Sequence, residues 1–218
     1  VLAGALIIKG PDVLNSVMQF DALSGLTPVI LIIVLCFCAA LTNTTAVTIS
    51  LEGKNLWIPK SNPVEPRDVF AAKVISNLII SVPAIMLVSW AVVPMSTLHA
   101  IILLILPVTA QVLSALWGLA ANLWFPQFNW INETALIKQS MSAMVGVFGA
   151  LAIVMLPVIL YAAALGSFID LDSYLILCSA IYIAACLALY GYLRATGEKL
   201  FLKLGDSNTK KTAKGILR

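Results

Sequence analysis

The sequence predicts an all-α membrane protein, a polytopic helix bundle with five complete spans and the end of a sixth. Composition is the first observation behind this prediction. Of the 218 residues, 61% are hydrophobic and 11% are charged, and the mean hydropathy is +1.02, far from the balance of a soluble domain. The second observation is that apolar residues form five runs, each near the ~20 residues that a helix needs to cross the hydrocarbon layer, at 26–49, 74–93, 100–123, 141–161 and 174–193.

Basic residues gather on one side of these runs. Of the 13 lysines and arginines, only Lys9 falls on the other side. The basic side holds Lys54, Lys60, Arg67, Lys73, Lys138, Arg194, Lys199, Lys203, Lys210, Lys211, Lys214 and Arg218. Because basic residues resist translocation, these connections and the C-terminus are predicted to be cytoplasmic, and Asp170 and Asp172 to lie outside.

Residues 1–8 are apolar but too short to span a bilayer, and Lys9, Gly10 and Pro11 follow them. We expect them to be the outer end of a helix that begins before this sequence, which makes the chain the C-terminal part of a longer polypeptide. The expected organisation is a transmembrane domain, 1–195, containing a cytoplasmic segment, 50–73, and then a basic cytoplasmic tail, 196–218.

The cytoplasmic segment 50–73 is too long and too patterned for a simple loop. Asn62, Pro63 and Glu65 have the spacing of a helix start, so a helix is predicted from Pro63 through Lys73 into the next span. The part before it is short and amphipathic, with apolar side chains at Leu51, Leu56, Trp57 and Ile58. Such a piece is suited to lie on the membrane surface or to dock on a cytoplasmic protein, and the residues alone leave both open.

This order of features resembles the permease domain of ABC type-2 exporters: a glutamate at the polar end of one span, an amphipathic segment, and a proline-led helix with a lysine before the next span. The matching residues are Glu52, Gly53, Pro63, Val64 and Lys73. The family has six spans with both ends in the cytoplasm, and its coupling helix, between spans two and three, contacts the ATPase subunit. The chain departs from the family at 55–58, where a glycine and a threonine are usual.

The resemblance implies the permease subunit of an exporter in a bacterial cell membrane. It implies an ABC ATPase subunit and a second permease half or a second copy as partners, beside the lipid bilayer. The residues implied to contact the ATPase are Glu52, Gly53, Lys54, Leu56, Trp57 and Pro63. The chain contains no G-x-x-x-x-G-K-[ST] phosphate loop, so ATP and Mg are expected on the separate ATPase, with no cofactor here.

Three polar side chains inside the spans, Asn43, Asn77 and Gln111, are candidates for lining a pathway, because polar groups facing lipid are costly. Hydrogen bonding between helices is the other explanation. None of the five runs contains an aspartate, glutamate, lysine or arginine, which disfavours a proton relay or a secondary carrier. A non-catalytic scaffold or partner subunit therefore remains the main alternative to an ATP-driven permease.

Small residues recur every four positions at Ser142, Gly146 and Ala150, a spacing that favours close helix packing. His99 is the only histidine and has no carboxylate or cysteine nearby in sequence, so no metal site or catalytic site is predicted. The basic tail is interpreted as lipid-facing or orienting charge rather than a nucleic-acid site. A helix is predicted to begin at Asn132. The apolar segment 161–169 fits either a re-entrant helix or a helix on the outer membrane surface.

Overall fold

The computed structural model describes residues 27–53, 55, 64–91, 97–128, 130, 132–166 and 168–204. The described chain is helical and contains no strand, which confirms the predicted all-α class. Its elements are α3 (Thr27–Leu41), α4 (Thr45–Leu51), α6 (Pro66–Ala91), α7 (Thr97–Trp124), α8 (Glu133–Gln139), α9 (Met141–Leu160), the π-helical turn η2 (Tyr161–Leu165), α10 (Leu171–Tyr192) and the π-helical turn η3 (Leu193–Gly197).

Five helical stretches are long and apolar enough to cross a membrane, as predicted. They are Val29–Leu51, Pro66–Ser89, Ile101–Trp124, Met141–Leu165 and Leu171–Leu204. Many large apolar side chains on their outer faces are exposed, such as Ile80, Phe148 and Leu187. Lipid rather than water is the solvent that such a surface requires, so the chain is a multi-pass membrane protein.

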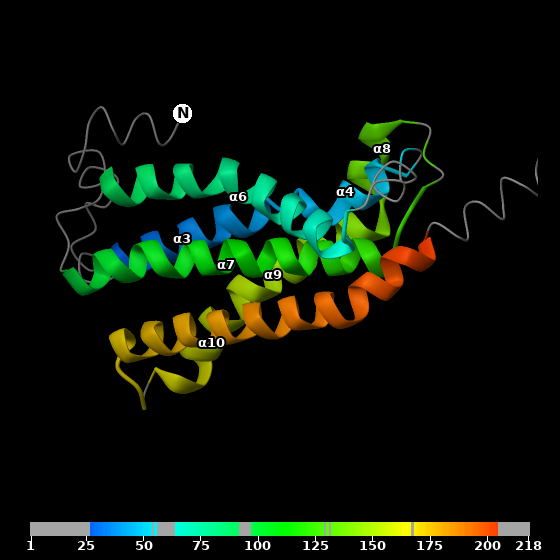
Figure 1. Cartoon of the computed structure of the whole chain (residues 1–218). Helices are drawn as coiled ribbons and strands as arrows, with labels where there is room; N and C mark the ends of the chain where they lie inside the picture. The colour runs from blue at the N-terminus through cyan, green and yellow to red at the C-terminus, as the bar shows by residue number, and fades with distance from the viewer. Residues whose placement is uncertain are drawn as a thin grey trace, which may run out of the picture.

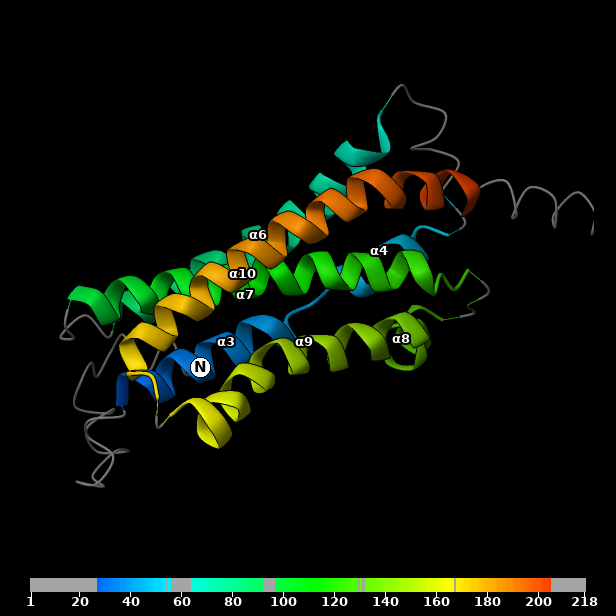
Figure 2. The same ribbon diagram turned by 90° about the horizontal axis from the view of Figure 1, so that it is seen from below.

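Helix α7 is the centre of the bundle, and α3, α4, α6, α9 and α10 all pack against it (Figures 1 and 2). It is the middle helix because small side chains, among them Ala110, Ala115, Ala120 and Ala121, let neighbouring backbones approach closely. One apolar cluster joins α7 to α3, α9 and α10, and a second joins it to α4, α6 and the end of α10.

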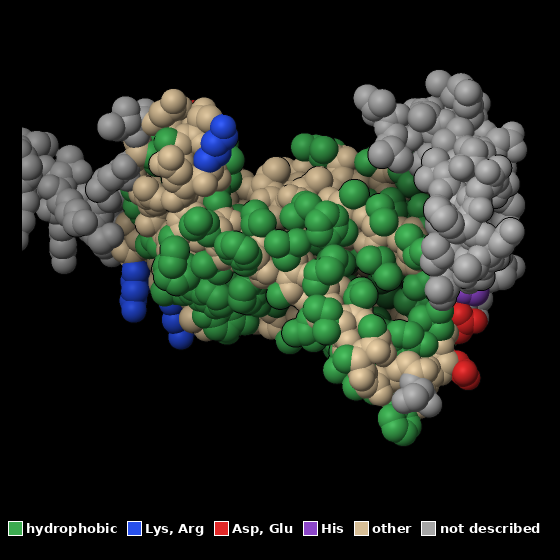
Figure 3. Space-filling view, turned by 180° about the vertical axis from the view of Figure 1, so that it is seen from behind, with side chains coloured by type: hydrophobic (Ala, Val, Ile, Leu, Met, Phe, Trp, Pro, Cys, Tyr) green, Lys and Arg blue, Asp and Glu red, His purple; other side chains and the backbone are tan. Residues whose placement is uncertain are grey.

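Charge divides the two ends of the bundle. Figure 3 shows lysine and arginine side chains at one end, and acidic side chains with the histidine at the other. His99 Nε2 lies 3.1 Å from Asp172 Oδ1 at the acidic end. The positive-inside rule predicts that the basic end, where α4 and α8 lie (Figure 1), faces the cytoplasm.

The helix predicted to start at Pro63 instead starts at Pro66, which corrects the sequence expectation. Val64 and Glu65 are not helical, while Asn62 and Pro63 lie outside the described residues. The physical reason is that a residue preceding a proline is disfavoured in helical conformation, so Glu65 cannot readily continue a helix into Pro66. The Glu65 carbonyl accepts hydrogen bonds from the Asp68 and Val69 amides and so begins the helix.

Three other predictions concern the start of α8, the segment after α9 and the end of the last helix. Asn132 does precede α8, and its side chain accepts a hydrogen bond from the Thr134 amide at 3.1 Å. The described part of 161–169 holds no separate re-entrant helix, because η2 continues α9 and a turn follows it. The boundary at 195 falls inside a helix that continues to Leu204, and residues 205–218 lie outside the described chain.

Candidate functional site: a break in the first span

The first span is not one helix. Its predicted run, 26–49, is divided into α3 and α4 by residues 42–44, which the backbone traverses without helical hydrogen bonding (Figure 2). Neither glycine nor proline causes this break. Short polar side chains compete for nearby backbone groups, and the hydroxyl and amide of Thr42 both donate to the Ala39 carbonyl, at 2.7 and 3.1 Å. The helix therefore ends in a closed turn.

Side chains from two neighbouring helices bind the carbonyls that the break leaves free. From α6, Asn77 Nδ2 donates to the Thr42 carbonyl at 2.7 Å and to the Thr44 hydroxyl at 2.8 Å. From α7, the Ser114 hydroxyl donates to the Ala40 carbonyl at 2.8 Å. An unsatisfied backbone group within the hydrocarbon layer costs several kcal/mol, so these donors make the break tolerable.

Gln111 connects the two helices that hold the break. Its side chain is fully buried, and its Nε2 donates to Asn77 Oδ1 at 2.5 Å. Asn77 therefore accepts from α7 on one side of its amide and donates to the break on the other. Spans one, two and three meet through these two side chains.

Asn43 points from the break into the surface of α7. Its Nδ2 donates to the Ser114 carbonyl at 2.9 Å, and its Oδ1 accepts from the Thr45 hydroxyl at 2.7 Å. It lies on Gly118, where an added Cβ would come 2.6 Å from Asn43 Nδ2. Gly118 is thus required by the position of Asn43. All three pathway candidates gather around one break, where their polar atoms join helices to each other.

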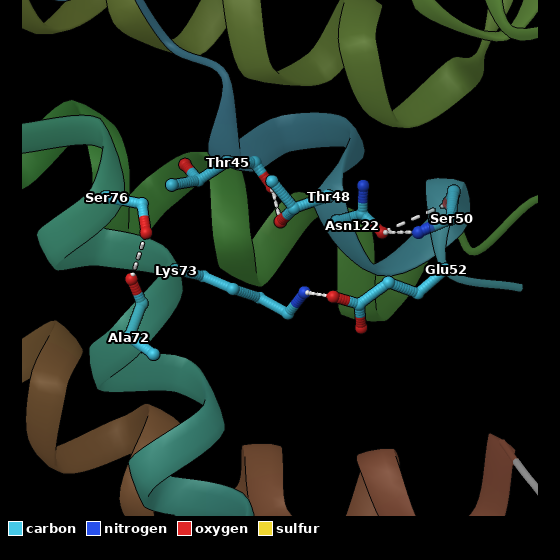
Figure 4. A network of polar contacts seen from close by, with 8 residues as sticks. All are labelled: Thr45, Thr48, Ser50, Glu52, Ala72, Lys73, Ser76 and Asn122. Atoms are coloured by element: carbon cyan, nitrogen blue, oxygen red, sulfur yellow. Dashed lines mark hydrogen bonds and ion pairs between the residues drawn. The ribbon is translucent and has the colours of Figure 1, made fainter. Parts of the chain in front are cut away.

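A second polar cluster lies closer to the basic end, and sequence reasoning did not identify it. The side chain of Asn122, in α7, is fully buried; its Oδ1 accepts from the amide and hydroxyl of Ser50, each at 3.1 Å (Figure 4), and its Nδ2 donates to the Ala46 carbonyl. The Ser50 carbonyl in turn accepts from Trp130 Nε1 at 2.9 Å. Asn122 thereby fixes α4 to α7, and Trp130 fixes the second cytoplasmic connection to α4. An amide inside an otherwise apolar run was the signal available in the sequence.

An ion pair closes the site at its basic end. Lys73 Nζ lies 2.6 Å from Glu52 Oε1, so the residue that follows α4 is joined directly to α6 (Figure 4). Lys73 is only 8% exposed, whereas Glu52 is 43% exposed. The other carboxylate oxygen, Oε2, is buried without a hydrogen-bond partner among the described residues.

Of the residues predicted to contact an ATPase, the structure describes two. Glu52 forms the ion pair above, and Gly53 lies under Phe128, since a Cβ there would come 2.6 Å from the Phe128 ring. The others lie outside the described residues, namely Lys54, Leu56, Trp57 and Pro63.

The small-residue face of α9 is buried against the same site. Ser142, Gly146 and Ala150 are all buried, and a Cβ on Gly146 would come 2.6 Å from the Ala46 Cβ. Helix α4 is therefore held between α7 and α9 by close backbone approach.

The chain matches no protein family model, no curated protein and no solved structure.

Proposed function

We propose that the chain is the membrane-spanning permease subunit of an ATP-driven ABC exporter, energised by a separate ATPase subunit that contacts segment 52–63. The observation that carries the proposal is the Glu52–Lys73 ion pair. It joins the end of α4, which follows the break in the first span, to α6, which carries Asn77. Export as the direction rests on the resemblance to ABC type-2 permeases.

A movement of segment 52–63 has a short mechanical path to the break. Its first end is continuous with α4, and its second end leads into α6, which carries both Lys73 and Asn77. A push from a bound ATPase therefore acts on α4 and α6 together. Because α3 and α4 are already separate helices, a change in the angle between them at the break costs neither helix its backbone hydrogen bonds.

The distribution of charge supports an external source of energy. The five apolar runs contain no acidic or basic residue, so nothing within them resembles the buried carboxylate or histidine chains of proton-driven carriers. In the proposed complex, two such halves, as two copies or as two related chains, enclose the path, and nucleotide-driven movement of the ATPases opens it outward.

One observation favours a second candidate, a non-catalytic partner subunit without a path of its own. The amides of Asn43, Asn77 and Gln111 are engaged in bonds between helices, and none is directed into an open polar channel in the described part of the chain. A scaffold needs only such bonds, whereas a permease needs them to exchange during transport.

Co-purification distinguishes the two candidates. The full-length protein is expressed with the ATPases encoded beside it, as wild type, as a Leu56→Ala/Trp57→Ala double variant and as Phe168→Ala, a control at the opposite end with a side chain 84% exposed. We expect the double variant to lose bound ATPase and ATPase activity, while the control retains both. Absence of any bound ATPase from the wild type would exclude the permease and leave the scaffold.

A further inference from the structure

A groove with a volume of about 310 Å³ opens between α6 and α10 near the basic end of the bundle. These two helices lie on either side of α7 (Figure 1), and α7 forms the floor of the groove through Val112, Leu116 and Leu119. Its α6 and α10 walls include Phe70, Ala71, Val74, Ile75, Leu187 and Tyr190. The lining is almost entirely apolar.

The two charged residues of the lining are both arginines. Arg67, the second residue of α6, and Arg194, two residues beyond the end of α10, both line the groove. Arg194 is exposed and has no ion pair in the described chain, while Arg67 pairs with the exposed carboxylate of Glu65. Two guanidinium groups on facing walls of the groove, both from its basic end, form a donor set suited to a phosphate group, which arginine binds bidentately.

The depth of the groove matches a hydrocarbon chain. On α6 its lining extends from Arg67 to Ile75, and on α10 from Arg194 to Cys186. Each interval is eight residues, or roughly 12 Å of helix rise directed from the basic end into the membrane. A free phosphate ion would use only the arginines, whereas an amphiphile with an anionic head would use the whole length.

The charge of the groove favours a lipid over a second protein helix as its occupant. Its apolar walls suit a hydrocarbon chain, and its two arginines suit an anionic headgroup. The cytoplasmic leaflet supplies such chains attached to anionic headgroups at the level where the arginines lie.

We infer that this groove is a binding site for an anionic phospholipid of the cytoplasmic leaflet. The lipid phosphate lies between Arg67 and Arg194, and one acyl chain lies along the floor formed by α7. The inference requires that the chain spans a membrane with its basic end at the cytoplasmic face, and it holds or fails independently of the proposed ATPase partner.

Native mass spectrometry of the full-length, delipidated protein in detergent tests the inference. Phosphatidylglycerol and phosphatidylcholine with the same acyl chains are titrated against the wild type and against Arg67→Gln/Arg194→Gln. The matched control is Lys199→Gln/Lys203→Gln, which removes the same charge from exposed positions at the same end but outside the groove. Each basic residue near an anionic headgroup contributes about a fivefold factor, so the arginine variant should bind phosphatidylglycerol roughly 30-fold more weakly.

The control should stay within about threefold of the wild type, since its lysines lie outside the groove and act only through a screened field. Equal loss in the two double variants would reduce the effect to general surface charge and overturn the inference. Equal affinity for phosphatidylcholine would overturn it as well.

Two further variants test the groove and the charge balance separately. Ala71→Trp fills the groove and leaves both arginines in place; it should lose bound phosphatidylglycerol while retaining a wild-type unfolding temperature. Glu65→Gln releases Arg67 from its ion pair and should strengthen binding. Unchanged binding in Ala71→Trp, or displacement of the lipid by millimolar inorganic phosphate, would show that the acyl chain is not held. Unchanged lipid counts in every variant would mean that another helix or a second copy covers the groove.

Discussion

Lys73 Nζ lies 2.6 Å from Glu52 Oε1 although the two residues are 21 positions apart in the sequence. The ion pair therefore fixes the residue that follows α4 directly to α6. Lys73 is buried and Glu52 is half-exposed. The contribution of this pair to stability therefore lies between that of a surface ion pair and that of a fully buried one.

Removing one partner of this pair should destabilise the protein more than removing both. Lys73→Met leaves the Glu52 carboxylate without its cation, and we expect the free energy of unfolding to fall by about 1–3 kcal/mol. The double variant Glu52→Gln/Lys73→Met should recover much of that loss. Unfolding in detergent, arranged as a double-mutant cycle, measures the coupling. Strict additivity of the two substitutions would show that the pair contributes nothing.

The number of spans could be predicted from composition because crossing a bilayer depends on local properties, which are apolar length and the side on which basic residues fall. The break in the first span could not be predicted in this way. Residues 42–44 leave the helix only because Asn77 and Ser114 satisfy the freed groups, and those partners lie 35 and 74 positions from the residues they bind. No local pattern contains that information.

The helix start at Pro66 shows a different limit. Pro63 and Pro66 both fit the first position of a helix, and by side-chain capping alone Asn62 before Pro63 is the better start. The competition is decided by the constraint that Pro66 places on Glu65, which sequence reasoning omitted. The contact between His99 and Asp172 could not be predicted for the same reason as the partners of the break. The two residues are far apart in sequence and meet only because the ends of α7 and α10 lie together.

The amide of Asn77 should stabilise the protein more than the neighbouring hydroxyl of Ser76. Asn77→Leu removes the donor to the Thr42 carbonyl, and because polar contacts between membrane helices are worth about 0.6–1.7 kcal/mol, a loss in that range is expected. Ser76→Ala is the matched control, since its hydroxyl bonds only to the Ala72 carbonyl of its own helix (Figure 4). Detergent unfolding should separate the two variants, and equal stability would remove Asn77 from its assigned role.

The assigned orientation can be checked with single cysteines. Phe168→Cys, at the turn after η2, should react with a membrane-impermeant maleimide in intact cells. Thr134→Cys, in exposed α8, should react only after the membrane is permeabilised. The background variant replaces the four native cysteines, Cys36, Cys38, Cys178 and Cys186, with alanine. The reverse labelling pattern would invert the topology and place segment 52–63 away from any cytoplasmic ATPase.

Two glycines that look alike in the sequence should respond in opposite ways to alanine. At Gly118 the new Cβ would lie 2.6 Å from Asn43 Nδ2, so Asn43 must leave its bond to the Ser114 carbonyl or α4 must shift. Such overpacking should lower the free energy of unfolding by about 1–3 kcal/mol. At Gly191 nothing lies within 4 Å of the new Cβ, so Gly191→Ala should be neutral or should stabilise α10 by up to about 1 kcal/mol through helix propensity. Thermal unfolding of both variants in the same detergent compares them directly. A stable Gly118→Ala protein with unchanged transport would mean that Asn43 is free to move, and that the break is not held in the way its hydrogen bonds indicate.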